Sequence, residues 1–130
     1  MRTEIEIWLK QAEKDLEAAE KNFKLNEWYL VAFLSQQAVE KALKALLLKK
    51  IKNPEMFLER HSLVYLGKMA KIPSKFFPFL RELTKDYIVS RYPGAGSIDE
   101  PPYELYDESK AKNVLKKAKE ILRWIKQQIK

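Results

Sequence analysis

The segment 90–106 gathers residue types that bind phosphate groups and flat aromatic rings. Arg91 offers a planar guanidinium with a fixed fork of donors, and Tyr92 offers an aromatic face and a hydroxyl. Tyr103 and Tyr106 add two aromatic faces, and two of the chain's three glycines allow close backbone approach. Interleaved basic and aromatic groups can hold the phosphate and base of a nucleotide. Because a long ordered loop in a small domain often carries function, we predict a binding site here.

The same residues also fit a purely structural role. The tyrosines can pack the loop over one end of the domain. Arg91 can then pair with a helix C-terminus or with a carboxylate such as Glu104. Spacing alone does not decide between binding and packing, so both interpretations stay open.

A second candidate group lies on the helix that we expect at about 27–50. Its polar residues form one narrow strip on an otherwise apolar helix, namely Gln37, Glu40, Lys41 and Lys44. A solvated face, or an internal Glu40–Lys44 pair at i,i+4 spacing, explains this strip. In the functional alternative, Gln37, Glu40 and Lys44 order the helix wall beside the binding loop.

The single histidine, His61, precedes a short helix that we expect to begin at Ser62. A lone histidine at a helix start usually packs or forms a local hydrogen bond. The functional alternative is that His61 assists the Arg91 loop.

Residue counts exclude most metal and nucleophile chemistry. One histidine and no cysteine cannot supply a multi-histidine or thiolate metal site. The sequence has no Walker loop, no GxGxxG and no HExxH, and its serines lie in no nucleophile-elbow context. We therefore predict no metal, no cofactor and no catalytic residue.

Long patterns with a period of 3.6 residues predict an all-α protein. The short helix at Ser62 joins four long ones, which we expect at about 3–22, 27–50, 75–89 and 107–128. Sequential amphipathic helices with mostly short connections favour an up-and-down four-helix bundle. With the additional short helix, the chain is predicted to form five helices in a single domain over residues 1–130.

The expected second helix is apolar on every side from Tyr29 to Leu34, and beyond this run it has only the narrow polar strip. Such a helix must be covered on several sides, either at the centre of a bundle or at a subunit interface. We therefore expect a homodimer.

The net charge of +7 invites a nucleic-acid interpretation, but its distribution favours a simpler one. Twenty of the 25 cations are lysine, whereas bidentate phosphate recognition favours arginine. Residues 107–130 carry eight cations and three carboxylates, and the lysines lie opposite the apolar stripe as on a solvated face. Adaptation to high temperature is an alternative source of such charge. The absence of cysteine and of long apolar runs favours a cytoplasmic protein without membrane contact.

Several short motifs, in their order along the chain, resemble the HEPN domain (higher eukaryotes and prokaryotes nucleotide-binding). They are Trp8, Ala12, Asp15-Leu16 and Ala19; the run 36–45; His61-Ser62-Leu63; Ser90-Arg91-Tyr92-Pro93; Tyr103-Glu104-Leu105-Tyr106; and Ala111 with Ala118. The resemblance covers nearly the whole chain. It implies a five-helix fold, commonly dimeric, that accompanies a minimal nucleotidyltransferase, often as a toxin–antitoxin pair.

Many HEPN proteins are metal-independent endoribonucleases in which four to six residues separate an arginine from a histidine. Arg91 matches that arginine, but the three positions where the histidine belongs hold Gly96, Ser97 and Ile98. We therefore predict a non-catalytic or weakly catalytic HEPN dimer that binds a nucleotide, RNA or a nucleotidyltransferase partner through the Arg91–Tyr106 loop. A metal-independent endoribonuclease toxin and a purely structural dimerisation module are the alternatives.

Overall fold

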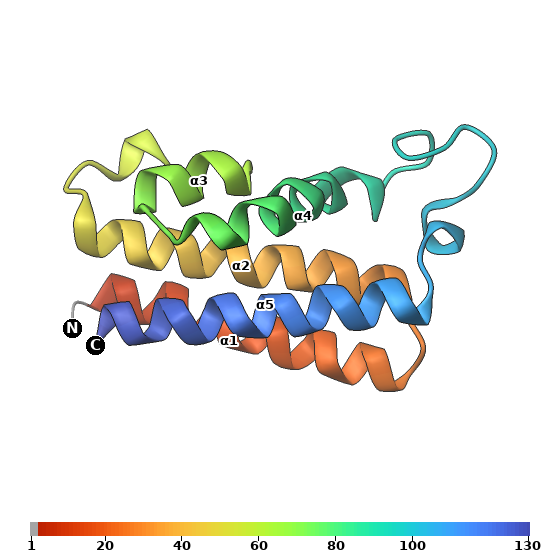
Figure 1. Ribbon diagram of the computed structural model, residues 1–130, viewed down its shortest axis with the longest axis horizontal. Helices are drawn as coiled ribbons and strands as arrows, with labels where there is room; N and C mark the ends of the chain where they lie inside the picture. The colour runs from red at the N-terminus through yellow and green to blue at the C-terminus, as the bar shows by residue number, and fades with distance from the viewer. Residues whose placement is uncertain (1–2) are drawn as a thin grey trace.

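The computed structural model describes residues 3–130, which form an up-and-down bundle (Figure 1). Its helices are α1 Thr3–Lys24, α2 Trp28–Lys50, α3 Leu63–Ala70, α4 Phe77–Val89 and α5 Glu108–Ile129. Three short 3₁₀ segments join them, and no strand occurs within residues 3–130. The predicted all-α fold with four long helices and one short helix is confirmed.

Helix α2 lies at the centre of the bundle. Fourteen of its 23 residues are buried, and it contacts each of the other four α-helices. Most of its apolar circumference is therefore covered within one chain. In the run 29–34, however, only Val31 and Ala32 are buried, and the other four side chains are half-buried. The homodimer stays a prediction.

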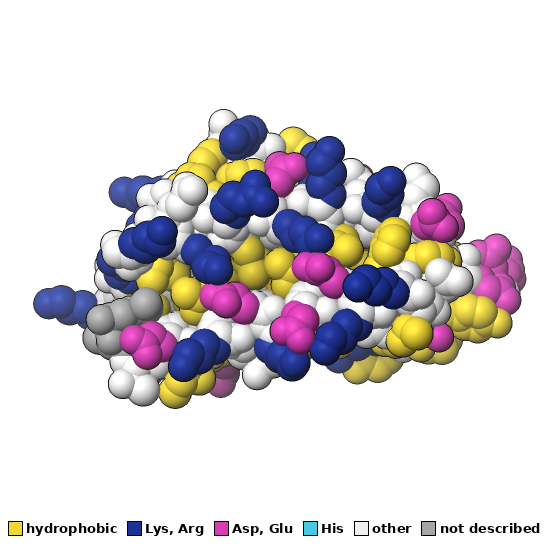
Figure 2. All heavy atoms as spheres, turned by 90° about the horizontal axis from the view of Figure 1, so that it is seen from below, with side chains coloured by type: hydrophobic (Ala, Val, Ile, Leu, Met, Phe, Trp, Pro, Cys, Tyr) yellow, Lys and Arg dark blue, Asp and Glu magenta, His cyan; other side chains and the backbone are white. Residues whose placement is uncertain are grey.

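The lower face of the bundle shows where much of the basic charge lies. Seen from below, the face of α1 and α5 carries basic and acidic side chains next to one another, with apolar side chains between them (Figure 2). Lys119 lies 3.4 Å from Glu20, and Lys126 lies 3.5 Å from Glu13. This mixture is typical of a solvated, ion-paired face rather than of a surface reserved for phosphate.

Side-chain caps begin two of the helices. Ser62 Oγ accepts a hydrogen bond from the backbone N–H of Tyr65 at the start of α3, as the sequence suggested. Asp107 Oδ1 accepts one from the N–H of Lys110 at 2.8 Å and begins α5. These caps fix where the long loop and the segment before α3 give way to helix.

The segment between α4 and α5 lies at the end of the bundle where α1 turns into α2 (Figure 1). At Gly96 a Cβ would lie 2.6 Å from Val89 Cγ1 and 2.8 Å from Leu105 Cδ1. A side chain at this position would therefore displace Val89 or Leu105, and glycine lets the loop pack closely against the end of α4.

None of the helices in residues 3–130 combines the length and the apolar character that crossing a membrane requires.

Leu43 tests the central position of α2. Its side chain is fully buried, so we expect Leu43→Ala to lower the free energy of unfolding by about 2–5 kcal/mol through lost contacts and a cavity. Leu25→Ala, at a position that is 69% exposed, should change it by less than about 0.5 kcal/mol. Urea denaturation measures both, and similar costs at the two positions would contradict the assignment of Leu43 to the core.

Candidate functional site

Arg91 follows the C-terminus of α4, and its side chain folds back on that helix. The Nε–H donates to the backbone carbonyl of Tyr87 at 2.8 Å, which satisfies an unpaired carbonyl of the last turn. The guanidinium carbon lies 4.4 Å from the ring centre of Tyr87, 4.9 Å from that of Tyr92 and 5.2 Å from that of Phe33. The helix C-terminal pairing considered from the sequence is thus present, and three aromatic rings hold the guanidinium beside it.

The Arg91 guanidinium keeps donors for a ligand. The residue is exposed, and within residues 3–130 no carboxylate lies within ion-pair distance of it. A guanidinium carries five N–H groups, and the Tyr87 carbonyl accepts only the one on Nε. Those on the two Nη atoms therefore face solvent or a ligand.

Arg91 and Tyr103 line the same groove, of about 390 Å³. Its other walls come from α2, from the end of α4 and from the segment before α5, and are formed by Tyr29, Leu30, Phe33, Ser90, Pro93 and Pro102. The rings of Tyr29 and Tyr103 meet edge to face with centres 6.5 Å apart. The groove thus has aromatic and proline walls, one cation and no carboxylate.

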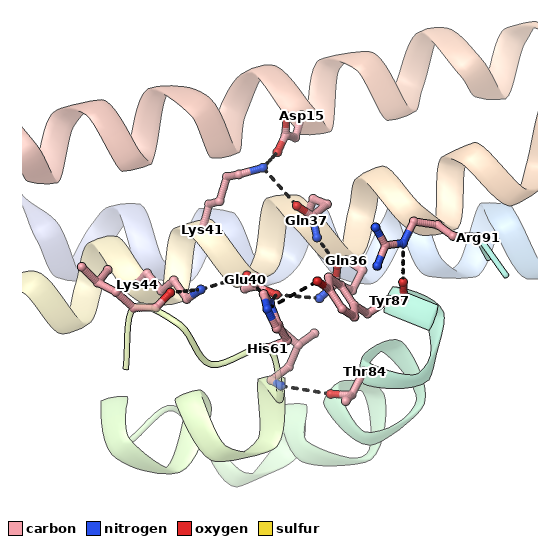
Figure 3. A network of polar contacts seen from close by, with 12 residues as sticks. Asp15, Gln36, Gln37, Glu40, Lys41, Lys44, His61, Thr84, Tyr87 and Arg91 are labelled. Carbon is pink, nitrogen blue, oxygen red and sulfur yellow. Dashed lines mark hydrogen bonds and ion pairs between the residues drawn. The ribbon is translucent and has the colours of Figure 1, made fainter. Parts of the chain in front are cut away.

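The polar strip of α2 is a buried network around Glu40 (Figure 3). The Glu40 carboxylate accepts hydrogen bonds from Gln36 Nε2 at 3.0 Å and from Lys44 Nζ at 2.9 Å. Lys44, whose side chain is 2% exposed, also donates to the backbone carbonyl of Leu58 at 2.7 Å. The Glu40–Lys44 pair considered from the sequence therefore exists, but it is buried rather than solvated.

Gln37 and Lys41 extend this network to α1. The Gln37 amide donates to Gln36 at 2.7 Å and accepts from Lys41 Nζ at 3.3 Å. Lys41 also forms an ion pair with Asp15 of α1 at 2.5 Å. One connected set of polar groups thus runs from α1 across α2 toward the start of α3 (Figure 3).

His61 joins the network to the Arg91 region. Its Nδ1 lies 3.2 Å and 3.3 Å from the two carboxylate oxygens of Glu40. Its ring stacks on Tyr87 with centres 4.3 Å apart and an angle of 15° between the planes. Because Tyr87 also contacts the Arg91 guanidinium, the fold brings together two candidates that are 30 residues apart in sequence.

Tyr106 lies in a different environment from the other candidate tyrosines. It is 5% exposed, and its hydroxyl donates to Asp86 Oδ1 of α4 at 2.5 Å. Ser90 Oγ donates to the Asp86 backbone carbonyl in the same buried cluster. Tyr106 therefore anchors the loop to α4, the packing role considered above, and does not line the groove of Arg91.

Burial sets the ionisation of this anchor. It raises the pKa of the Asp86 carboxyl above the ordinary value, and the hydrogen bond from Tyr106 offsets only part of that rise. Burial and the neighbouring Asp86 both raise the pKa of the Tyr106 phenol, which stays a hydrogen-bond donor.

Sequence reasoning missed Tyr29, Phe33 and Tyr87 as parts of the site and Asp86 as the loop anchor. Tyr87 lies in the last turn of α4, four residues before Arg91, and this spacing across a helix end can bring the two side chains together. Asp86 follows Leu83 by three residues on the apolar stripe of α4, where a carboxylate needs a buried partner. In the described part of the chain, no three His, Asp or Glu side chains form a group that could hold a metal ion.

Comparison with known proteins identifies the family. A model of the HEPN domain matches residues 5–128. The chain belongs to the HEPN domain family. The resemblance drawn from the order of motifs is therefore confirmed.

Two solved structures share this HEPN fold. ST0689, an archaeal HEPN homologue, is 36% identical with a TM-score of 0.79, and the match covers 100% of both chains. TT1696 from Thermus thermophilus is 28% identical with a TM-score of 0.86, and the match covers 98% of this chain and 99% of the other. A search of curated proteins gives no significant match.

The buried hydrogen bond between Tyr106 and Asp86 predicts that the stability of the protein depends on pH. Because the folded-state pKa of Asp86 lies above the unfolded value of about 3.9, its contribution to stability is complete below that pH and is lost as the pH rises through the folded-state pKa. Asp86→Asn keeps an acceptor for Tyr106 but cannot ionise. We expect the stability of the variant relative to wild type to increase as the pH rises from about 4 to 7. Urea denaturation across this range measures it, and parallel curves for the two proteins would rule the effect out.

Proposed function

We propose that this HEPN domain binds the phosphate of a nucleotide or RNA at Arg91. The carrying observation is a guanidinium fixed through Nε, held by three aromatic rings and without a carboxylate partner in the described residues. An arginine held in this way is preorganised for a bidentate contact with phosphate, because fewer rotamers are lost on binding.

The groove beside Arg91 supports a ligand that joins a phosphate to a flat ring. Tyr103 is 59% exposed and faces Tyr29 across an edge-to-face contact, so a base can stack at this wall. Tyr92 is 53% exposed and adds a second aromatic face beside the guanidinium. The groove also contains the hydroxyl of Ser90, but this hydroxyl already donates a hydrogen bond to the backbone carbonyl of Asp86. Stacking on these rings therefore contributes to binding whatever the base.

The proposal includes a homodimer and a minimal nucleotidyltransferase partner, as in a cytoplasmic toxin–antitoxin pair. Family resemblance supports both partners. Exposed apolar side chains at the loop end of α4 supply surface for them, since Ile88 is 51% exposed and Ile98 is 92% exposed. The endoribonuclease and structural-module alternatives stay predictions, and the first lacks the family's histidine after Arg91.

Arg91→Ala tests the phosphate contact. We expect the variant to bind ATP or a short single-stranded RNA about ten- to a hundredfold more weakly, equivalent to roughly 1.5–3 kcal/mol for a charge-assisted hydrogen bond. With RNA, the slope of log K against log salt should also fall by about 0.7 for one lost phosphate contact. Fluorescence anisotropy over a salt series measures both quantities.

Arg81→Ala is the matched control, because Arg81 is an exposed arginine within α4 that does not line the groove. It should bind the same ligands within about twofold of wild type. Equal affinities for the wild type and Arg91→Ala, or equal losses in both variants, would remove Arg91 from the proposal.

A further inference from the structure

The two nitrogens of the His61 imidazole differ in how firmly they are held. Nδ1 lies against both oxygens of Glu40. The side chain is nevertheless 48% exposed, so part of the ring edge is open to solvent. The atom that such an open edge can offer a ligand is Nε2.

Glu40 sets which nitrogen of His61 carries the proton. As the partner of the Lys44 ammonium, the Glu40 carboxylate offers only acceptor positions. The neighbour on its other side, Gln36 Nε2, also donates to it. His61 Nδ1 must therefore donate to it as well, and in the neutral imidazole Nε2 is then an acceptor.

The Tyr87 hydroxyl forms only a weak hydrogen bond with Nε2. Its oxygen is 3.4 Å from Nε2, which is long for a hydrogen bond, and the two rings are stacked with only 15° between their planes. The lone pair of Nε2 lies in the plane of the imidazole, so it is poorly aligned with a hydroxyl of the stacked ring. A ligand hydroxyl that approaches in the imidazole plane can therefore replace this contact.

This acceptor lies close to the proposed phosphate contact. His61 and Arg91 each lie against the ring of Tyr87, at 4.3 Å and 4.4 Å from its centre. The distance between the imidazole centre of His61 and the guanidinium carbon of Arg91 therefore cannot exceed the sum of these two distances. The sugar and phosphate of one nucleotide can bridge such a distance. The sugar group that can donate to Nε2 is the 2′-hydroxyl, which RNA has and DNA lacks.

We propose that His61 Nε2 accepts a hydrogen bond from the ribose 2′-hydroxyl of the nucleotide whose phosphate Arg91 holds, so that the site selects RNA over DNA. Glu40 acts as a positioning residue, because it fixes the tautomer that makes Nε2 an acceptor. The inference rests on the proposed phosphate contact at Arg91. It adds the class of nucleic acid and the residue that distinguishes it.

Four single-stranded oligonucleotides of one sequence test the selection without altering the protein: RNA, DNA, 2′-fluoro RNA and 2′-O-methyl RNA. The 2′-fluoro strand keeps an electronegative 2′ substituent but has no proton to donate. We expect RNA to bind about five- to tenfold more tightly than DNA and 2′-fluoro RNA, the effect of one hydrogen bond. Fluorescence anisotropy at low temperature gives the dissociation constants. Equal binding of RNA and 2′-fluoro RNA overturns the proposal.

Two variants assign the preference to His61. In His61→Ala the ratio of RNA affinity to DNA affinity should fall to about one, whatever the change in overall affinity. Glu40→Gln should reduce the preference as well, because a glutamine amide can donate to Nδ1 and leave Nε2 protonated. Circular dichroism and thermal unfolding verify that this second variant is folded. An RNA preference that persists in His61→Ala overturns the proposal.

The binding measurements distinguish a failure of the proposed phosphate contact at Arg91 from a failure of the proposed role of His61. If neither RNA nor DNA binds, or if Arg91→Ala binds both as tightly as wild type, the phosphate contact itself is wrong. If Arg91→Ala weakens RNA and DNA equally while wild type shows no preference between them, the phosphate contact stands and only the role of His61 is wrong. Degradation of RNA that His61→Ala abolishes supports the contact between His61 and the 2′-hydroxyl.

Discussion

The structure depends on a buried ion pair in the middle of its central helix. Glu40 and Lys44 are almost completely shielded from water, and two charges in such a place are tolerated only when every donor and acceptor finds a partner. Gln36 and His61 complete the shell of Glu40, and the Leu58 carbonyl contributes to that of Lys44. The ion pair on α2 thus requires residues 58–61 to lie against it. Because α3 follows directly after this segment, the buried pair also determines where α3 begins.

The same requirement positions the candidate site. His61 cannot leave Glu40 without depriving a buried carboxylate of a partner, and its ring in turn supports Tyr87. Tyr87 supplies both a ring and a backbone carbonyl to Arg91. On the other side of α4, the hydrogen bond between Tyr106 and Asp86 holds the loop that places Tyr103 opposite Tyr29. The buried contacts of His61 with Glu40 and of Tyr106 with Asp86 therefore position the arginine, the histidine and the aromatic rings of the candidate site.

Much of this arrangement was predictable from sequence, for identifiable reasons. The helices follow from a 3.6-residue period sustained over many turns. Arg91 and Tyr103, which the sequence groups in one loop, line one groove in the structure. The different positions of Tyr103, in the groove, and Tyr106, in the buried contact with Asp86, were not predictable from sequence. The two tyrosines are three residues apart, and only the folded structure shows which of them reaches Asp86. The exact ends of the helices also depend on backbone conformations that the sequence pattern does not specify. Asn26, which lies between the first two helices, adopts a φ of 62° and ends α1, with the N–H of Glu27 bonded to the Asn22 carbonyl.

The central claim is that Glu40 fixes the tautomer of His61 and leaves Nε2 as an acceptor beside Arg91. Because the chain has a single histidine, a long-range ¹H–¹⁵N correlation spectrum of the imidazole is unambiguous. For the neutral imidazole, the account predicts a protonated Nδ1 and an unprotonated Nε2. A proton on Nε2, or averaged shifts from two exchanging tautomers, would contradict it.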